Sequence, residues 1–141
     1  MRLTAIAAAD LPRVWPTAEP WLAQACARPG DHGITAKGLL AACAQEQALL
    51  ILIGPPGEPV AAVVSQVIVE GGGTLSCWLL ALGGSRWREW QHLMAEIEAG
   101  ARRMGCRTVE FIGRPAWRRV FPDYATAPVP AGIHFLKFLA S

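Results

Sequence analysis

Two short stretches of the chain hold residues that could bind or react with a ligand. The first is a glycine turn, Leu82-Gly83-Gly84-Ser85-Arg86-Trp87, which separates an apolar run of strand length from a helical pattern. Where a strand runs into a helix, backbone N–H groups of the first turn are free and the helix dipole favours an anion. We therefore expect a phosphorylated ligand to bind at this turn.

Glu110 is the second candidate, because it alternates with Val109 and Phe111 on a predicted strand. A parallel strand is usually covered on both faces, so a carboxylate there would be buried and would need a partner. One hypothesis makes Glu110 a general base that takes a proton from an amine. The other pairs it with Arg114 or another nearby arginine, and the abundance of arginine in this region favours the ion pair.

A strand–helix–strand unit positions both candidates. Leu75–Leu82 is the first apolar run, Arg86–Met104 repeats large apolar residues at helical spacing, and Val109–Ile112 is a second short strand. Two strands joined by a helix are expected to lie parallel in one sheet with a right-handed crossover. On the predicted helix, Trp87 and Trp90 share the apolar stripe, while Glu98 and Arg102 have the spacing of a surface ion pair.

The rest of the chain predicts further strands and short helices. A helix is expected to begin at Asp10 and to be split by Pro16 and Pro20, and another to begin at Thr35. Short links between three apolar runs predict an antiparallel meander that ends in Leu75–Leu82. The other expected strands are 2–7, 48–53, 60–69, 125–129 and 133–139, with a short helical turn over 113–120.

Length and composition predict one globular domain over residues 1–141. The chain is 52% hydrophobic and 17% charged, which excludes a disordered protein. Residues 86–141 carry nine basic and five acidic side chains, whereas residues 1–85 carry four basic and six acidic ones. The basic half could favour a nucleotide-like cofactor, a nucleic acid or an acidic protein surface, although a solvated arginine-rich surface explains the charge more simply.

The cysteine spacing and the hydropathy pattern argue against a metal-binding protein and against a transmembrane protein. Cys26, Cys43, Cys77 and Cys106 have neither metal-site nor Cys-x-x-Cys spacing, so we expect no metal and a reduced, cytoplasmic protein with cysteines in its core. No apolar stretch is long enough for a transmembrane helix.

The order of elements resembles the GNAT acyltransferase superfamily along nearly the whole chain. The stretch Gly105 to Arg119, with its Gly-Cys, strand Glu and Gly-Arg-x-x-Trp run, is similar to small GNAT-like proteins encoded by phages and prophages. The resemblance implies an α/β fold of the α+β type, with a mixed, mostly antiparallel sheet and helices on both faces. It also implies that acyl-CoA lies between the central strand and the following parallel strand.

In that superfamily the pyrophosphate binds a loop that reads Gln/Arg-x-x-Gly-x-Gly/Ala. The matching loop here, residues 82–87, lacks the motif but keeps two glycines, while Ser85 could cap the helix and Arg86 could contact a phosphate. Trp87 stands where the family uses a small residue. A tyrosine often protonates the leaving thiolate in this family, but Tyr124 stands nearer the next strand and is also consistent with simple packing.

The function expected from the resemblance is N-acyl transfer from acetyl-CoA or another acyl-CoA to an unidentified amine. Gly83–Trp87 would then hold the pyrophosphate, Leu80–Leu82 would align the pantetheine, and Glu110 would be the candidate base. The alternative is a catalytically silent GNAT-like module that binds a partner protein in phage assembly, which the missing loop motif also fits. Nucleic-acid binding is the weaker third hypothesis, and a homodimer is compatible with the sequence.

Overall fold

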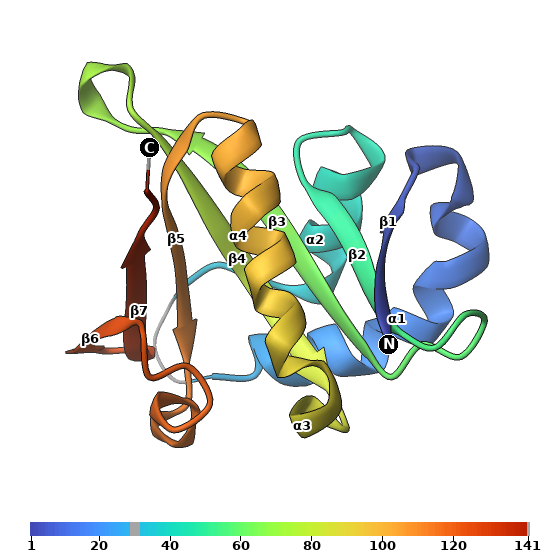
Figure 1. Ribbon diagram of the computed structural model, residues 1–141. Helices are drawn as coiled ribbons and strands as arrows, with labels where there is room; N and C mark the ends of the chain where they lie inside the picture. Colours follow the sequence, from blue (N-terminus) through green and yellow to red (C-terminus); the bar gives the residue numbers. More distant parts are fainter. Residues whose placement is uncertain (29–31, 141) are drawn as a thin grey trace.

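The computed structural model describes residues 1–28 and 32–140, and a seven-stranded sheet forms its centre (Figure 1). The strand order is β1-β2-β3-β4-β5-β7-β6; β4 and β5 run parallel, and the other neighbouring pairs are antiparallel. The strands are β1 (Arg2–Ile6), β2 (Leu49–Gly54), β3 (Ala61–Val69), β4 (Leu75–Gly84), β5 (Cys106–Gly113), β6 (Ala125–Val129) and β7 (Gly132–Phe138). The expected mixed sheet, the meander and the parallel pair are all confirmed.

Helices pack on both faces of this sheet, as expected. α4 (Met94–Arg103) crosses one face, and α1 (Leu11–Cys26) and α2 (Ala36–Ala44) cover part of the other (Figure 1). The remaining helical segments are α3 (Trp87–Trp90) and the 3-10 turns η1 (Ala8–Asp10), η2 (Gly71–Gly73), η3 (Gln91–Leu93) and η4 (Pro115–Arg118). Each face has its own apolar core, so the sheet is buried from both sides where helices cover it.

The expected split of the first long helix is wrong. α1 runs without a break from Leu11 to Cys26 and contains both Pro16 and Pro20. Pro12, Pro16 and Pro20 are four residues apart, so they lie on one stripe of the helix, and all three are exposed. Water can therefore hydrogen-bond the carbonyls that lack a proline N–H partner, and the buried side of the helix keeps its packing.

The single helix expected from Arg86 to Met104 is also wrong. The segment is divided into α3, η3 and α4, with the break at Trp90, whose φ of −122° lies outside the helical range. The Trp90 indole N–H turns back to the carbonyl oxygen of Ser85 at 2.9 Å. Met104, which the apolar stripe placed in the core, is 64% exposed beyond the end of α4.

Glu98 does not form the expected surface pair with Arg102. It lies on the buried side of α4 with Met94, Ile97 and Ala101, and is only 8% exposed. Its position four residues after Met94 and three before Ala101 places it on the apolar stripe, so burial follows from the helical period.

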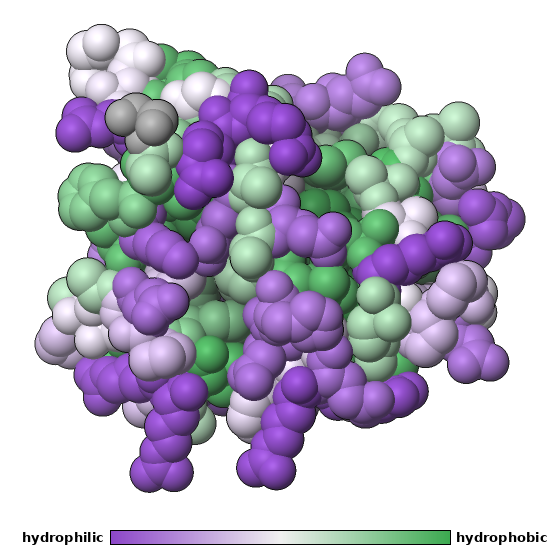
Figure 2. Space-filling model, viewed as in Figure 1, coloured by the Kyte–Doolittle hydropathy of each residue, from purple (hydrophilic) through white to green (hydrophobic). Residues whose placement is uncertain are grey.

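The side of the molecule that α4 crosses carries many hydrophilic side chains at its surface. Figure 2 shows this side, with apolar side chains in the recesses between the hydrophilic ones. No helix in residues 1–28 and 32–140 is both long and apolar enough to cross a membrane. All four cysteines are free thiols; three are buried and Cys26 is half-buried, as expected for core residues.

Candidate functional site

The two parallel strands separate at one end of the sheet. β4 and β5 pair as far as Leu79 opposite Phe111, and beyond that point each strand pairs with its outer neighbour alone. β4 continues beside β3 to Gly84, and β5 continues beside β7 to Gly113. The inner edges of both strands therefore expose backbone groups that have no strand partner across the gap.

A β-bulge at Leu80 accompanies this separation. In the pairing with β3, Val64 is opposite Ala81 but Ser65 is opposite Leu79, so Leu80 has no opposite residue. A bulge bends its strand and locally increases the twist. Leu80 and Ala81 both pack in the core on the α1 side, which shows that the alternation of the strand is interrupted here.

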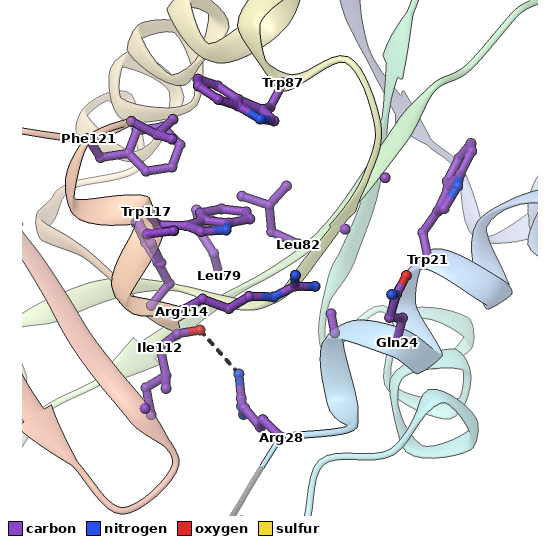
Figure 3. Close-up of a pocket in the computed structure, with 18 of the residues that line it drawn as sticks. Trp21, Gln24, Arg28, Leu79, Leu82, Trp87, Ile112, Arg114, Trp117 and Phe121 are labelled. Carbon is purple, nitrogen blue, oxygen red and sulfur yellow. Dashed lines mark hydrogen bonds between the residues drawn. The ribbon is translucent and has the colours of Figure 1, made fainter.

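The gap between the strands opens into a cleft of about 710 Å³. Its floor includes Leu79, Leu82 and Phe111, and its walls include three separate segments of the chain (Figure 3). Trp21, Gln24 and Arg28 come from α1 and its C-terminal end, Trp87 from α3, and Arg114 and Trp117 from the segment after β5. A concave, mostly apolar cleft with a few polar groups is the usual form of a small-molecule site.

The β4–α3 turn lies at this cleft, but its glycines have a packing role. Of the six residues expected to bind the cofactor, Leu82, Gly83, Gly84 and Trp87 line the cleft, whereas Ser85 and Arg86 do not. A Cβ at Gly83 would collide with the carbonyl oxygen of Trp21, and one at Gly84 would collide with Val60 and Ala61. Both glycines therefore let other backbone segments pass close to β4.

Ser85 and Arg86 already have hydrogen-bond partners on neighbouring segments. The Ser85 N–H donates to the carbonyl oxygen of Val60 at 2.9 Å. Arg86, in the left-handed backbone region at φ 58°, donates through Nε and Nη2 to the carboxylate of Glu89 at 2.5 and 2.7 Å. This hydrogen bond lowers the pKa of Glu89 and raises that of Arg86. Two of the five N–H donors of Arg86 are thus used by Glu89, and the other donors do not take part in this pair.

Glu110 is buried as expected, but its partners are not arginines. Its carboxylate accepts hydrogen bonds from Thr108 Oγ1 at 2.8 Å and from His134 Nε2 at 2.9 Å. The ring of His134 stacks on Trp78 with centroids 5.4 Å apart. Glu110 and Arg114 form no ion pair with each other, so the expected Arg114 partner is wrong.

Glu110 itself is not part of the cleft wall. It lies one residue before Phe111 and two before Ile112, both of which line the cleft. Ile112 points to the same face of β5 as Glu110, because strand residues two apart share a face. Glu110 is thus adjacent to the site but held in a hydrogen-bonded cluster beside it.

Tyr124 is directed away from the cleft into a second polar cluster. Its hydroxyl donates to Glu98 at 2.7 Å, and Lys137 Nζ donates to the same carboxylate at 2.9 Å. Burial, followed by the hydrogen bond to Glu98, raises the pKa of Tyr124. The cluster ties α4 to β7 and to the segment before β6, so its role in the structure is to join elements.

The α1 contribution to the cleft was not expected from the sequence. Trp21, Gln24 and Arg28 are far from β4 in the chain, and their approach depends on Gly83, which lies directly against the Trp21 carbonyl. Among the described residues, no group of three or more His, Cys, Asp or Glu side chains is placed to bind a metal ion.

Comparison with known proteins finds similarity at the level of structure. No family model matches the sequence, and no curated protein matches it. Among solved structures, aminoglycoside 6′-acetyltransferase type Ii has a TM-score of 0.69 at 15% identity, covering 100% of this chain and 99% of that one. The chain has the fold of the GNAT acetyltransferases.

Two further solved structures support this assignment of the fold. The GNAT domain of S. lividans PAT has a TM-score of 0.68 at 18% identity, covering 98% of this chain and 90% of that one. The PaiA N-acetyltransferase from Thermoplasma acidophilum, solved in complex with coenzyme A, has a TM-score of 0.66 at 11% identity, covering 98% of this chain and 99% of that one.

Proposed function

We propose that this protein is a GNAT-type N-acyltransferase that transfers an acyl group from acyl-CoA to an amine. The observation that supports it most strongly is the unpaired inner edge of β4 beyond Leu79, where Leu82 and Gly83 line a cleft of about 710 Å³. A pantetheine arm is an extended chain with two amide groups, so it can hydrogen-bond such an edge as another strand would. Structural neighbours of the chain include acetyltransferases solved with coenzyme A.

The residues of the cleft fit the arm of acyl-CoA better than its pyrophosphate. Leu82, Trp87 and Trp117 offer apolar walls beside the β4 edge. At the turn, Gly84 to Trp87 would face the pyrophosphate, and Arg86 would contact a phosphate oxygen through N–H donors that do not bond Glu89. When bound, the thioester of acyl-CoA supplies the activated acyl group and a thiolate leaving group.

The chain's own contribution would be to orient the amine and to remove its proton. The Leu80–Leu82 edge would fix the thioester, so that attack by the amine becomes effectively intramolecular. Glu110 stays the candidate base, two residues before Ile112 in the cleft lining and hydrogen-bonded to His134. We also propose, from the Gly105–Arg119 stretch, that the chain is related to small GNAT-like proteins of phages and prophages.

Isothermal titration calorimetry with coenzyme A and acetyl-CoA tests the proposal. We expect saturable binding by the wild-type protein and loss of binding in Leu82→Glu, which places a negative charge on the cleft floor. Leu49→Glu is the matched control, because Leu49 is 41% exposed on β2 and does not line the cleft. Absence of saturation at about millimolar ligand, a weak affinity near −4 kcal/mol, would contradict the enzyme and leave the partner-binding module.

A further inference from the structure

The charge of the cleft is positive. Among the described residues that line it, the only ionisable side chains are Arg28 and Arg114, and no Asp or Glu is present. The two guanidinium groups that line this cleft repel each other, and an anion bound between them removes this repulsion. A positive cleft also disfavours a cationic acceptor such as a polyamine.

Arg28 is positioned by the structure with donors still to satisfy. Its Nη1 makes one long hydrogen bond to the carbonyl oxygen of Ile112 at 3.3 Å, and its Nε is buried without a partner among the described residues. Burial lowers the pKa of this guanidinium. His32 holds the backbone at this point, since it accepts from Ile34 N–H at Nδ1 and donates from Nε2 to the Arg28 carbonyl.

Arg114 approaches from the opposite wall. It follows β5 on an exposed segment, and its side chain extends into the cleft toward α1, where Gln24 lies (Figure 3). Arg28 follows the C-terminal end of α1 and Arg114 follows β5, so two distant parts of the chain each bring one arginine to the lining of this cleft. A planar carboxylate can accept paired hydrogen bonds from such guanidinium groups.

Arg28 lies away from the β4–α3 turn, where the pyrophosphate of acyl-CoA is proposed to bind. In Figure 3 Arg28 lies at the end of the cleft opposite Trp87, which marks the β4–α3 turn. The pyrophosphate is proposed at that turn, so an anion at Arg28 comes from the other substrate. Trp21 and Trp117 line opposite walls of the cleft (Figure 3). Their indole rings suit an acceptor with an apolar or aromatic side chain.

We infer that the acceptor is an amine that also carries a carboxylate, an amino acid or a close analogue, and that Arg28 and Arg114 bind this carboxylate. This inference rests on the proposed acyl transfer. The product would then be an N-acyl amino acid, which keeps the carboxylate and can be used as a probe that needs no turnover.

A thermal-shift panel of N-acetyl amino acids, each beside its neutral amide and all with coenzyme A present, tests the inference. A ligand that binds the folded state raises the melting temperature. We expect at least one acid to bind about tenfold or more tightly than its amide, which is what a hydrogen bond to a charged group contributes. Arg28→Gln and Arg114→Gln should remove this preference, whereas Arg118→Gln, outside the cleft lining, should keep it.

The outcomes separate this inference from the proposed function. If no acid binds better than its amide, or if the preference persists in Arg28→Gln, the carboxylate site is wrong even when coenzyme A binds. If Arg28→Gln instead weakens coenzyme A alone, the arginine binds a cofactor phosphate and the inference also fails. Failure of coenzyme A to bind wild type contradicts the proposed function itself.

Discussion

Glu110 can act either on a substrate or on the stability of the sheet. Its carboxylate is held by Thr108 and His134, and the His134 ring is packed on Trp78. The side chain of Glu110 is 10% exposed and that of His134 is 26% exposed. A cluster of this kind joins β5 to β7 and also covers the carboxylate, so the structural role is favoured at this residue.

We expect Glu110→Gln to lower the free energy of unfolding by about 1–3 kcal/mol, the usual cost of disturbing a buried hydrogen-bonded group. Urea unfolding measures it, with Glu96→Gln on the exposed side of α4 as the control. The change should couple with His134→Ala in a double-mutant cycle and add independently to Arg114→Ala. Unchanged stability with a transfer rate reduced by ~10²–10⁴-fold would instead make Glu110 the general base.

The burial of Glu110 could be predicted from the sequence, but its partners could not. A carboxylate between Val109 and Phe111 on a covered strand had to be buried, and Arg114, four residues later, was the arginine expected to pair with it. His134 is 24 residues away, and it reaches Glu110 only through the register that places Ile112 opposite His134. Strand register between β5 and β7 depends on packing across the sheet, which local patterns do not encode.

At the scale of elements, the position of α1 against β4 depends on one glycine. Gly83 lies against the carbonyl oxygen of Trp21, so α1 can approach the end of β4 and bring Trp21, Gln24 and Arg28 to the cleft. We expect Gly83→Ala to cost about 1–3 kcal/mol, as for other overpacked sites. Differential scanning calorimetry would show this as a lower melting temperature.

Gly71→Ala is the matched control for this change. A Cβ at Gly71 meets nothing within 4 Å, and its φ lies outside the left-handed region, so its effect should stay within about 0.5 kcal/mol. If Gly83→Ala kept wild-type stability and lost only coenzyme A binding, the glycine would serve the phosphate, as its place in the turn first suggested.

The helices and strands that follow from the hydrophobic period were predicted well. The breaks and bulges that depend on one residue were not. The strands and α2, with Thr35 Oγ1 accepting from Gly38 N–H at 3.0 Å, follow from pattern and capping. The break at Trp90 depends on an indole that bonds back to Ser85. The bulge at Leu80, which accompanies the opening of the cleft, has no signature in a run of apolar residues.

At the scale of the whole molecule, the two faces of the sheet have different chemistry. The core on the α1 side contains the buried thiol of Cys43, whereas the core under α4 encloses Cys77, Cys106 and the phenol of Tyr124. Burial raises the pKa of the Cys77 thiol from 9.0 to about 12, with Cys106 nearby as the smaller cause. Burial and the hydrogen bond to Glu98 raise the pKa of Tyr124 as well.

These raised pKa values make the fold sensitive to alkali. Consider a thiol whose pKa is higher in the folded state than in the unfolded state. Its contribution to stability is complete when the pH is below the pKa of the unfolded state, and it is lost as the pH rises toward the pKa of the folded state. For Cys77 the loss falls between pH 9.0 and about 12, and the raised pKa of Tyr124 acts in the same direction. A tenfold difference in acid dissociation constant between the folded and unfolded states corresponds to about 1.4 kcal/mol of stability.

We therefore expect the free energy of unfolding, measured with urea from about pH 8 to about pH 11, to fall as pH rises, because the unfolded chain releases protons that the folded chain keeps. Cys77→Ala and Tyr124→Phe should each reduce this slope, whatever their effect on stability at neutral pH. Ser76→Ala, a neighbouring change on β4 that removes no titrating group, should leave the slope unchanged. An equal slope in Cys77→Ala and wild type would show that the core under α4 admits the thiolate, and that α4 covers the sheet less tightly than its packing indicates.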